Sequence, residues 1–273
     1  MEDWTRVRLL RPLSLGPAVE VWRARMGRRR VVVRRYMPLR PGSPWPPPPD
    51  PAVLAAVNHP ALVRFLDHWR DADGVECHGF VEARGETLAD VLARGPLPPD
   101  RWTDVACRCA IGLRWLHERC PLAPRLHGDV SLRNIHVSID GRARWLDVRA
   151  DRPGLRPDGD VILGTLHCLA PEVLRGEAPS AASEIFALGL VALAAAVGPL
   201  PWRGARSPIE VLEAWDRNPP ATLATRLPSP AGTLLEAMLA PTPADRPAAR
   251  DVVTHLRKGL PARRTRGHFL YKG

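Results

Sequence analysis

The 273-residue chain is 45% hydrophobic and 25% charged, which is the composition of a folded globular protein and argues against disordered and collagen-like classes. Its five Cys are scattered and include no Cys-x-x-Cys pair, so we expect reduced thiols in a cytoplasmic protein and neither a disulfide framework nor a zinc site. The formal net charge of +10 comes from Arg spread over the whole chain rather than from one basic segment, so a nucleic-acid partner is not expected.

The N-terminal part, residues 1–84, is predicted to consist mostly of β-strands. The block 28–36 is rich in β-branched residues, and the segment that starts at Val19 alternates with period two, so two antiparallel strands are expected. The proline-rich stretch 38–51 is predicted to be a loop or a polyproline II segment. A short helix follows, with Asp50 as its N-cap and a proline at its first position.

The chain after residue 85 is predicted to be mainly helical. A hairpin is expected over 135–148, where Asp140-Gly141 is a type I′ turn signal, and helices are expected from 170 to about 256. A long amphipathic helix comes before the hairpin. Its apolar stripe consists of Trp102, Val105, Ala106, Cys109, Leu113 and Leu116.

No membrane span or leader sequence is predicted. The longest uncharged stretch, 185–202, is broken by Gly198 and two prolines, so its helical part is shorter than the ~20 residues that a span requires. We therefore expect a buried core helix there and no membrane partner. At the start of the chain, Glu2 and Asp3 are unlike the basic opening of a secretory leader.

Three oxygen-bearing side chains are predicted to gather on adjacent loops. Asp129 and Asn134 lie in the segment HGDVSLRN, and Asp147 follows at the end of the hairpin. Phosphoryl transfer from ATP requires one carboxylate that accepts or orients the proton of the attacking hydroxyl. It also requires an Asn and a second carboxylate that hold Mg²⁺ on the phosphates. The sequence therefore indicates a phosphotransferase site.

This segment resembles the HRDxxxxN and DFG motifs of protein kinases. The resemblance implies that Asp129 is the catalytic base and that Asn134 and Asp147 are the metal ligands. Arg133 stands where tyrosine kinases and their relatives place a cation near the γ-phosphate, so it is a further catalytic candidate. The cofactors implied are ATP and Mg²⁺ or Mn²⁺.

Three later motifs also resemble those of protein kinases. GTLHCLAPE at 164–172 is similar to the end of a kinase activation loop, and SEIFALG at 183–189 is similar to the start of a buried kinase helix. In PADRP, Arg246 stands where kinases pair an arginine with the glutamate that is Glu172 here. Gly164-Thr165 points to Ser/Thr rather than Tyr specificity.

The resemblance implies a two-lobed α+β fold. We expect a protein kinase-like domain over 1–262, with a small antiparallel β N-lobe to about 84, a large helical C-lobe, and a basic tail at 263–273. The type implied is a bacterial Ser/Thr protein kinase, with a protein substrate or a docking partner.

The N-lobe departs from the kinase pattern. The segment 14–19 keeps only Gly16 of the phosphate loop, and Arg34 replaces the phosphate-anchoring lysine. Arginine is longer and forked, so it is not equivalent to a compact ammonium group. Asp50 stands where the helix glutamate that pairs with this lysine belongs, although its N-cap role is favoured. The nucleotide-binding positions that the resemblance implies are Gly16, Val21, Val32, Arg34, Val81 and Glu82.

Three functions therefore remain open. The retained acidic residues favour a Ser/Thr kinase with reduced or conditional activity, with Asp129, Arg34 and Arg133 as catalytic residues. The altered N-lobe favours a pseudokinase that acts as a scaffold or regulator by binding a partner. HGDxxxxN also occurs in small-molecule phosphotransferases of the aminoglycoside and choline type, but these lack the APE and DRP segments.

Overall fold

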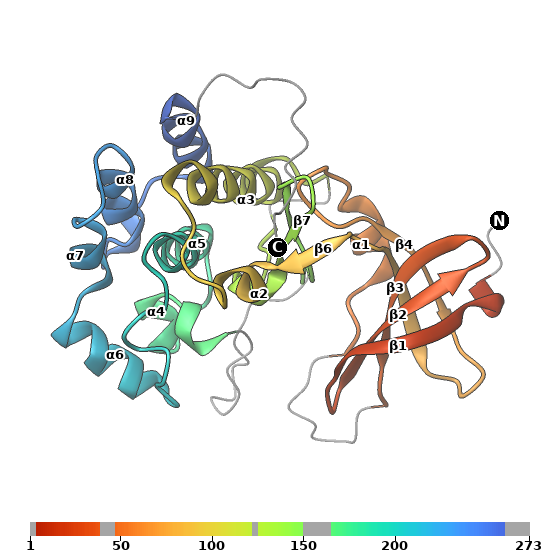
Figure 1. Cartoon of the computed structure of the whole chain (residues 1–273). Helices are drawn as coiled ribbons and strands as arrows, with labels where there is room; N and C mark the ends of the chain where they lie inside the picture. The colour runs from red at the N-terminus through yellow and green to blue at the C-terminus, as the bar shows by residue number, and fades with distance from the viewer. Residues whose placement is uncertain (1–3, 39–46, 122–124, 150–164, 260–273) are drawn as a thin grey trace.

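The structure, a computed structural model, describes residues 4–38, 47–121, 125–149 and 165–259. It has an N-terminal lobe built on a β-sheet and a larger helical C-terminal lobe, which confirms the expected two-lobed α+β fold (Figure 1). The expected basic tail at 263–273 lies outside the described residues. The strands are β1 (Arg8–Leu15), β2 (Val19–Met26), β3 (Arg29–Tyr36), β4 (Phe65–Arg70), β5 (Glu76–Val81), β6 (Gly85–Thr87), β7 (Ile135–Ser138) and β8 (Ala143–Trp145).

The predicted helical region of the chain is also confirmed. The helices are α1 (Pro51–Ala56), α2 (Leu88–Leu92), α3 (Pro99–Arg119), α4 (Pro171–Leu174), α5 (Ala181–Val197), α6 (Pro208–Arg217), α7 (Pro220–Ala224), α8 (Ala231–Met238) and α9 (Ala249–Gly259). Short 3-10 helices lie at Trp4–Arg6, Leu132–Asn134, Leu166–Cys168 and Pro243–Asp245.

The N-terminal lobe is an antiparallel sheet with the strand order β1-β2-β3-β5-β4. Both predicted strands, β2 and β3, are present and pair along their full length. One face of the sheet is covered by Trp4, whose ring stacks on Trp69 with centroids 4.9 Å apart. This packing requires glycine at position 79, because a Cβ there would lie 2.6 Å from the Trp4 ring.

Helix α1 begins as the sequence predicts. The carboxylate of Asp50 accepts a hydrogen bond of 2.8 Å from the backbone N–H of Ala52, and Pro51 occupies the first turn, where its missing N–H costs nothing. Val53 and Leu54 are buried. The N-cap interpretation of Asp50 is therefore confirmed.

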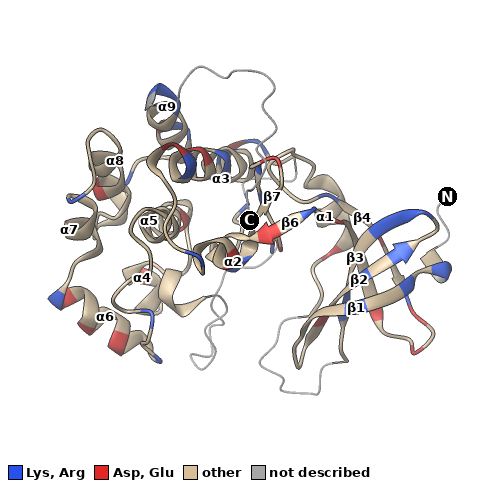
Figure 2. Ribbon diagram, in the orientation of Figure 1, with Lys and Arg blue, Asp and Glu red and all other residues tan. Residues whose placement is uncertain are grey.

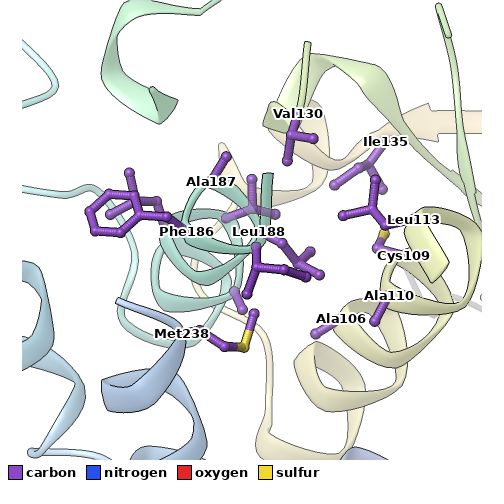
Figure 3. Close-up of a cluster of buried hydrophobic side chains, with 14 of the residues drawn as sticks. Ala106, Cys109, Ala110, Leu113, Val130, Ile135, Phe186, Ala187, Leu188 and Met238 are labelled. Atoms are coloured by element: carbon purple, nitrogen blue, oxygen red, sulfur yellow. The ribbon is translucent and has the colours of Figure 1, made fainter. Parts of the chain in front are cut away.

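The core of the C-terminal lobe lies between α3 and α5. The six apolar residues predicted to share one face of the long helix are all buried. Figure 3 shows Leu113 and Cys109 of α3 pointing toward Leu188 of α5. Helix α5 is buried along nearly its whole length, which confirms the core-helix interpretation. No helix in the part of the chain that the structure describes could cross a membrane.

The predicted hairpin forms, but its turn differs from the prediction. Strands β7 and β8 pair with β6 in a three-stranded sheet. A type I′ turn requires positive φ at two residues, whereas only Gly141 has it here, with φ of 75°. The N–H of Gly141 donates to Ser138, and the loop from Ser138 to Arg142 has three residues. Gly141 thus supplies the left-handed position of a three-residue loop.

Charged residues are distributed over both lobes. Figure 2 shows Lys and Arg residues on strands of the N-terminal lobe, including the connection between β2 and β3, and on helices of the C-terminal lobe. All five cysteines are free thiols, as predicted, and four of them are buried.

Candidate functional site

Asp129 lies on a loop that hydrogen bonds from neighbouring residues hold in place. The side-chain amide of Asn134 donates a 3.0 Å hydrogen bond to the carbonyl of Asp129. The hydroxyl of Thr165 donates a 3.2 Å hydrogen bond to Oδ1 of the Asp129 carboxylate. The backbone N–H of Leu146 donates to the carbonyl of Asn134 at 2.7 Å, which ties this loop to the segment that carries Asp147.

Asp147 follows β8 in an unusual backbone conformation. Its φ is 51°, the single positive value at a non-glycine among the described residues. Aspartate tolerates this left-handed region better than most side chains, at a cost in strain. Just beyond, the N–H of Arg149 donates a 2.7 Å hydrogen bond to the carbonyl of His127, whose ring packs on Trp145. The turn therefore brings the two acidic loops together.

Arg34 reaches from β3 to this cluster. Its Nη1 donates to Oδ1 of Asp147, which makes an ion pair between residues 113 positions apart. Burial would lower the pKa of Arg34, but the charge of Asp147 outweighs it and raises that pKa above its ordinary value. Arg34, which the resemblance places where a phosphate would be anchored, is thus bound to a carboxylate.

A second guanidinium group lies on the other side of Asp147. Nη2 of Arg149 is 3.4 Å from Oδ2 of Asp147 and 3.8 Å from Oδ2 of Asp129. Burial would raise the pKa of the Asp147 carboxyl, but Arg34 and Arg149 hold it well below its ordinary range. Asp147 is therefore ionised at neutral pH, and two arginines balance its charge and that of Asp129.

The side chains of this cluster suit a magnesium or manganese ion by type. Asp129, Asn134 and Asp147 offer carboxylate and amide oxygens, which are the ligands that such hard cations prefer. The cluster lies at the expected place, on two adjacent loops. Arg34 and Arg149 already supply the positive charge that a metal would bring.

The connection between β1 and β2 offers few donors to phosphates. The N–H of Gly16 is hydrogen-bonded to the carbonyl of Val19 at 3.1 Å, and Pro17 has no N–H. A phosphate loop works by pointing several free backbone N–H groups at its ligand. The N–H of Gly16 is therefore already used within the turn, and its role as a nucleotide-binding position stays a prediction.

One face of the N-terminal sheet bears Arg34, which reaches Asp147, and is called the cleft face. It carries three of the predicted nucleotide positions. Val21 is the cross-strand partner of Arg34, and Val32 lies two residues before Arg34 on the same strand, so the three side chains share one face. Phe80 pairs with Val32 on this face, and the guanidinium carbon of Arg34 lies 5.9 Å from the centre of its ring. Sequence analysis missed Phe80, although the period-two pattern of its strand could have indicated it.

Val81 and Glu82 are placed differently. Val81 pairs with Val31, so its side chain lies on the face opposite to Arg34. The Glu82 side chain is 6% exposed, and its Oε1 lies 2.5 Å from Nε of Arg23. The Val81 side chain is therefore turned away from Arg34, whereas the Glu82 side chain is held by Arg23, the cross-strand partner of Val32, on the same face as Arg34.

Arg133 is exposed at the 3-10 helix Leu132–Asn134. No ion pair or hydrogen bond joins its side chain to another residue within the described ranges. It therefore lies next to the acidic cluster in sequence without being part of its network.

A small cavity opens beside Asp129. Its volume is about 30 Å³, enough for a water-sized group such as a hydroxyl. Thr165, Cys168, Ser183 and Glu184 contribute to its walls. Burial raises the pKa of the Cys168 thiol to about 12, so this sulfur is uncharged at neutral pH.

Glu184 supports the loop that carries Gly128 and Asp129, a role that sequence analysis missed. Its carboxylate accepts a 2.7 Å hydrogen bond from the backbone N–H of Gly128 and lies 2.7 Å from Nε2 of His117. Burial would raise the pKa of this carboxyl, but the hydrogen bond and charge of His117 keep it below its ordinary value. An acidic residue in an otherwise apolar helix was the available signal.

The predicted pair between Glu172 and Arg246 is present. Nη1 and Nη2 of Arg246 donate to the two carboxylate oxygens at 2.6 and 2.8 Å, and the arginine side chain is fully buried. Further hydrogen bonds run from Arg246 to the carbonyls of Ala240, Pro241 and Ala182. The pair is bidentate and is satisfied on all sides.

Comparison with known proteins agrees with this geometry. A family model for the protein kinase domain matches residues 50–256. The matched segment contains the loops of Asp129 and Asp147, and it begins after β3, so Gly16 and Arg34 lie before it.

Individual relatives are serine/threonine-protein kinases. Pkn2 of Myxococcus xanthus is 30% identical over 214 residues, which are 73% of this chain and 25% of that protein. PknB of Mycobacterium tuberculosis is 28% identical over 166 residues, 58% of this chain and 26% of its own length. PknL of Mycobacterium tuberculosis is 31% identical over 158 residues, 55% of this chain and 38% of its own length. The chain thus spans between a quarter and two fifths of these relatives.

Proposed function

This chain belongs to the protein kinase family, and from that premise we propose that it is an ATP-dependent protein serine/threonine kinase with conditional activity. The observation that carries the proposal is the convergence of Asp129, Asn134 and Asp147, with the Thr165 hydroxyl bound to Asp129. The identity to bacterial serine/threonine-protein kinases supports the same class of substrate.

In this proposal Asp129 accepts or orients the proton of the attacking hydroxyl. The hydrogen bond from Thr165 holds one carboxylate oxygen, and the cavity beside it has room for the hydroxyl of a Ser or Thr side chain. Asn134 and Asp147 would hold Mg²⁺ or Mn²⁺, which when bound neutralises charge on the ATP phosphates. Arg133, exposed beside this loop, is free to approach the transferred phosphoryl group.

The nucleotide would lie against the cleft face of the N-terminal sheet. Val21 and Val32 offer apolar contact to the base, and the backbone of Val81 and Glu82 offers polar contact. Arg34 would reach the phosphates, and Gly16 would lie above them. This assignment is supported by the shared face of Val21, Val32 and Arg34.

Two features support conditional rather than full activity. Arg34 binds Asp147 instead of standing free for phosphates, and it is a larger group than the lysine it replaces. The turn at Gly16 presents few free N–H groups. Both features weaken nucleotide binding in the described conformation, so a change at the cleft has to precede efficient turnover.

A pseudokinase scaffold is the second candidate, and a specific observation favours it. Asp147, the proposed metal ligand, has a guanidinium group at each of its carboxylate oxygens. A chain fixed in that arrangement would act through partners that bind its surface. The third alternative, a small-molecule phosphotransferase, is disfavoured by the protein kinase match and by the buried pair of Glu172 and Arg246.

Transfer of the γ-phosphate from radiolabelled ATP to Ser- and Thr-containing peptides, with Mg²⁺ or Mn²⁺, tests the proposal. Asp129→Asn should lower turnover by ~10²–10⁴-fold, the usual effect of losing a general base, while ATP affinity stays nearly the same. Transfer by the parent protein that survives this substitution would contradict the role of Asp129. If the parent protein transfers no phosphate with either metal, the pseudokinase scaffold becomes the favoured function.

A further inference from the structure

Arg149 lies between the two acidic side chains of the site. Its Nη2 is 3.4 Å from Oδ2 of Asp147 and 3.8 Å from Oδ2 of Asp129. Arg34 binds the other oxygen of Asp147. Two carboxylates are thus matched by two guanidinium groups, and the local charge is balanced.

We propose that Arg149 is the resident counter-ion of this cluster, and that a divalent cation binds Asp147 only by displacing its guanidinium group. The inference rests on the proposed function and adds to it a residue that sets the metal dependence of the site. Arg149 stands in the cleft as an internal competitor for the metal.

The acidic cluster is neutral as long as both arginines are in place. With both arginines in place, a divalent cation would enter a cluster that has no net negative charge left to attract it. The carboxylates of Asp129 and Asp147 are only 12% and 10% exposed, so water and salt screen these interactions less than at the surface. One guanidinium group therefore has to leave before the metal can bind.

The two arginines differ in how they are anchored and how far they are exposed. Arg34 is anchored on β3 between β2 and β5, and its side chain is 18% exposed. The Arg149 side chain is 31% exposed, and its ion-pair distances of 3.4 and 3.8 Å are those of loose contacts. Because the N–H of Arg149 is bound to His127, the side chain can swing toward solvent while its backbone stays in place. Arg149 is thus the group that a metal displaces.

A matched control exists on the neighbouring hairpin. Nε of Arg142 lies 3.0 Å from Oδ2 of Asp140, but both side chains are more than half exposed. Arg142→Ala removes the same charge as Arg149→Ala without touching the acidic cluster. A general effect of net charge on metal binding would appear equally in both variants.

The test is a titration of the full chain with Mn²⁺ in the absence of nucleotide, with free Mn²⁺ followed by electron paramagnetic resonance. Arg149→Ala should bind Mn²⁺ about tenfold more tightly than the parent, because a competing charge of the cluster is gone. Arg142→Ala should bind like the parent. Arg149→Gln, which keeps the length of the side chain, provides a second variant if the alanine protein does not fold.

Equal Mn²⁺ affinity of the parent and the Arg149 variants would overturn the inference, whether both bind or neither does. An equal gain in Arg142→Ala would also overturn it, since the effect would then be one of net charge. The titration needs neither ATP nor phosphate transfer. A scaffold without kinase activity can therefore still support the inference, and an active kinase can still refute it.

Discussion

Arg246 and Glu172 form a buried bidentate ion pair, with hydrogen bonds of 2.6 and 2.8 Å between residues 74 positions apart. The guanidinium group also lies 4.8 Å from the centre of the Phe186 ring. This pair joins the short helix α4, just after the segment of Thr165, to the chain before α9. It thereby holds in place the segment whose Thr165 hydroxyl is hydrogen-bonded to Asp129.

Removal of one partner of this pair should be strongly destabilising. In Arg246→Met the Glu172 carboxylate would stay buried without its counter-charge, which costs about 3–5 kcal/mol of the free energy of unfolding. Urea denaturation at neutral pH measures the change. Arg250→Ala is the control, because that arginine is 62% exposed and its contact with Glu118 is 3.8 Å long, so a loss of at most ~1 kcal/mol is expected. Similar losses in both variants would contradict the structural role of the pair.

Arg34→Lys should raise the rate of phosphate transfer. A compact ammonium group fits the α- and β-phosphates better than a forked guanidinium group and would bind Asp147 less extensively. Steady-state kinetics with ATP and Mn²⁺ measure the change. Arg35→Lys is the matched control, because Arg35 lies next on β3 with Asp71 and Glu20 as its partners, on the opposite face of the sheet. If Arg34→Lys changes neither the rate nor the KM for ATP, Arg34 does not contact phosphates.

Glu184 should make the stability of the protein depend on acid pH. Its pKa is lower in the folded chain than in the unfolded chain, so its contribution is fully present above the unfolded value of about 4.3. That contribution is lost as the pH falls through the folded pKa. Urea midpoints measured between neutral and acid pH should therefore decline less steeply in Glu184→Gln than in the parent. Glu236→Gln, at an exposed position of α8, should follow the parent. Parallel profiles for all three proteins would refute the assignment.

Gly112 should tolerate no side chain. A Cβ at this position of α3 would lie 2.6 Å from the ring of Trp145, which is fully buried and donates a hydrogen bond to the carbonyl of Cys109. Gly112→Ala is expected to lower the free energy of unfolding by about 1–3 kcal/mol through overpacking. At Gly204 a Cβ meets nothing within 4 Å, so Gly204→Ala should be neutral or slightly stabilising. Thermal unfolding of the two variants compares them, and equal stability would show that Trp145 can move aside.

Local features of the fold could be predicted because they depend on neighbours in the chain. The cap at Asp50 needs only the residues that follow it, and the strand β3 follows from its β-branched block. The stripe on α3 follows from helical periodicity, which predicts burial without knowledge of the partner. The pair of Glu172 and Arg246 was found through the resemblance of two motifs to a known family, since no spacing rule connects residues that far apart.

The charge arrangement of the site could not be predicted in this way. The sequence alone determined that Asp129, Asn134 and Asp147 lie on adjacent loops, because a hairpin of known length joins them. Only the tertiary structure decided that Arg34 meets Asp147 across 113 residues, that Arg149 turns back over both carboxylates, and that Glu184 supports Gly128 from below. The physical reason is that motif spacing reports backbone geometry over a few residues. Which charges meet depends instead on how the two lobes pack. It also depends on which of the many arginines reaches a carboxylate that the fold has shielded from water.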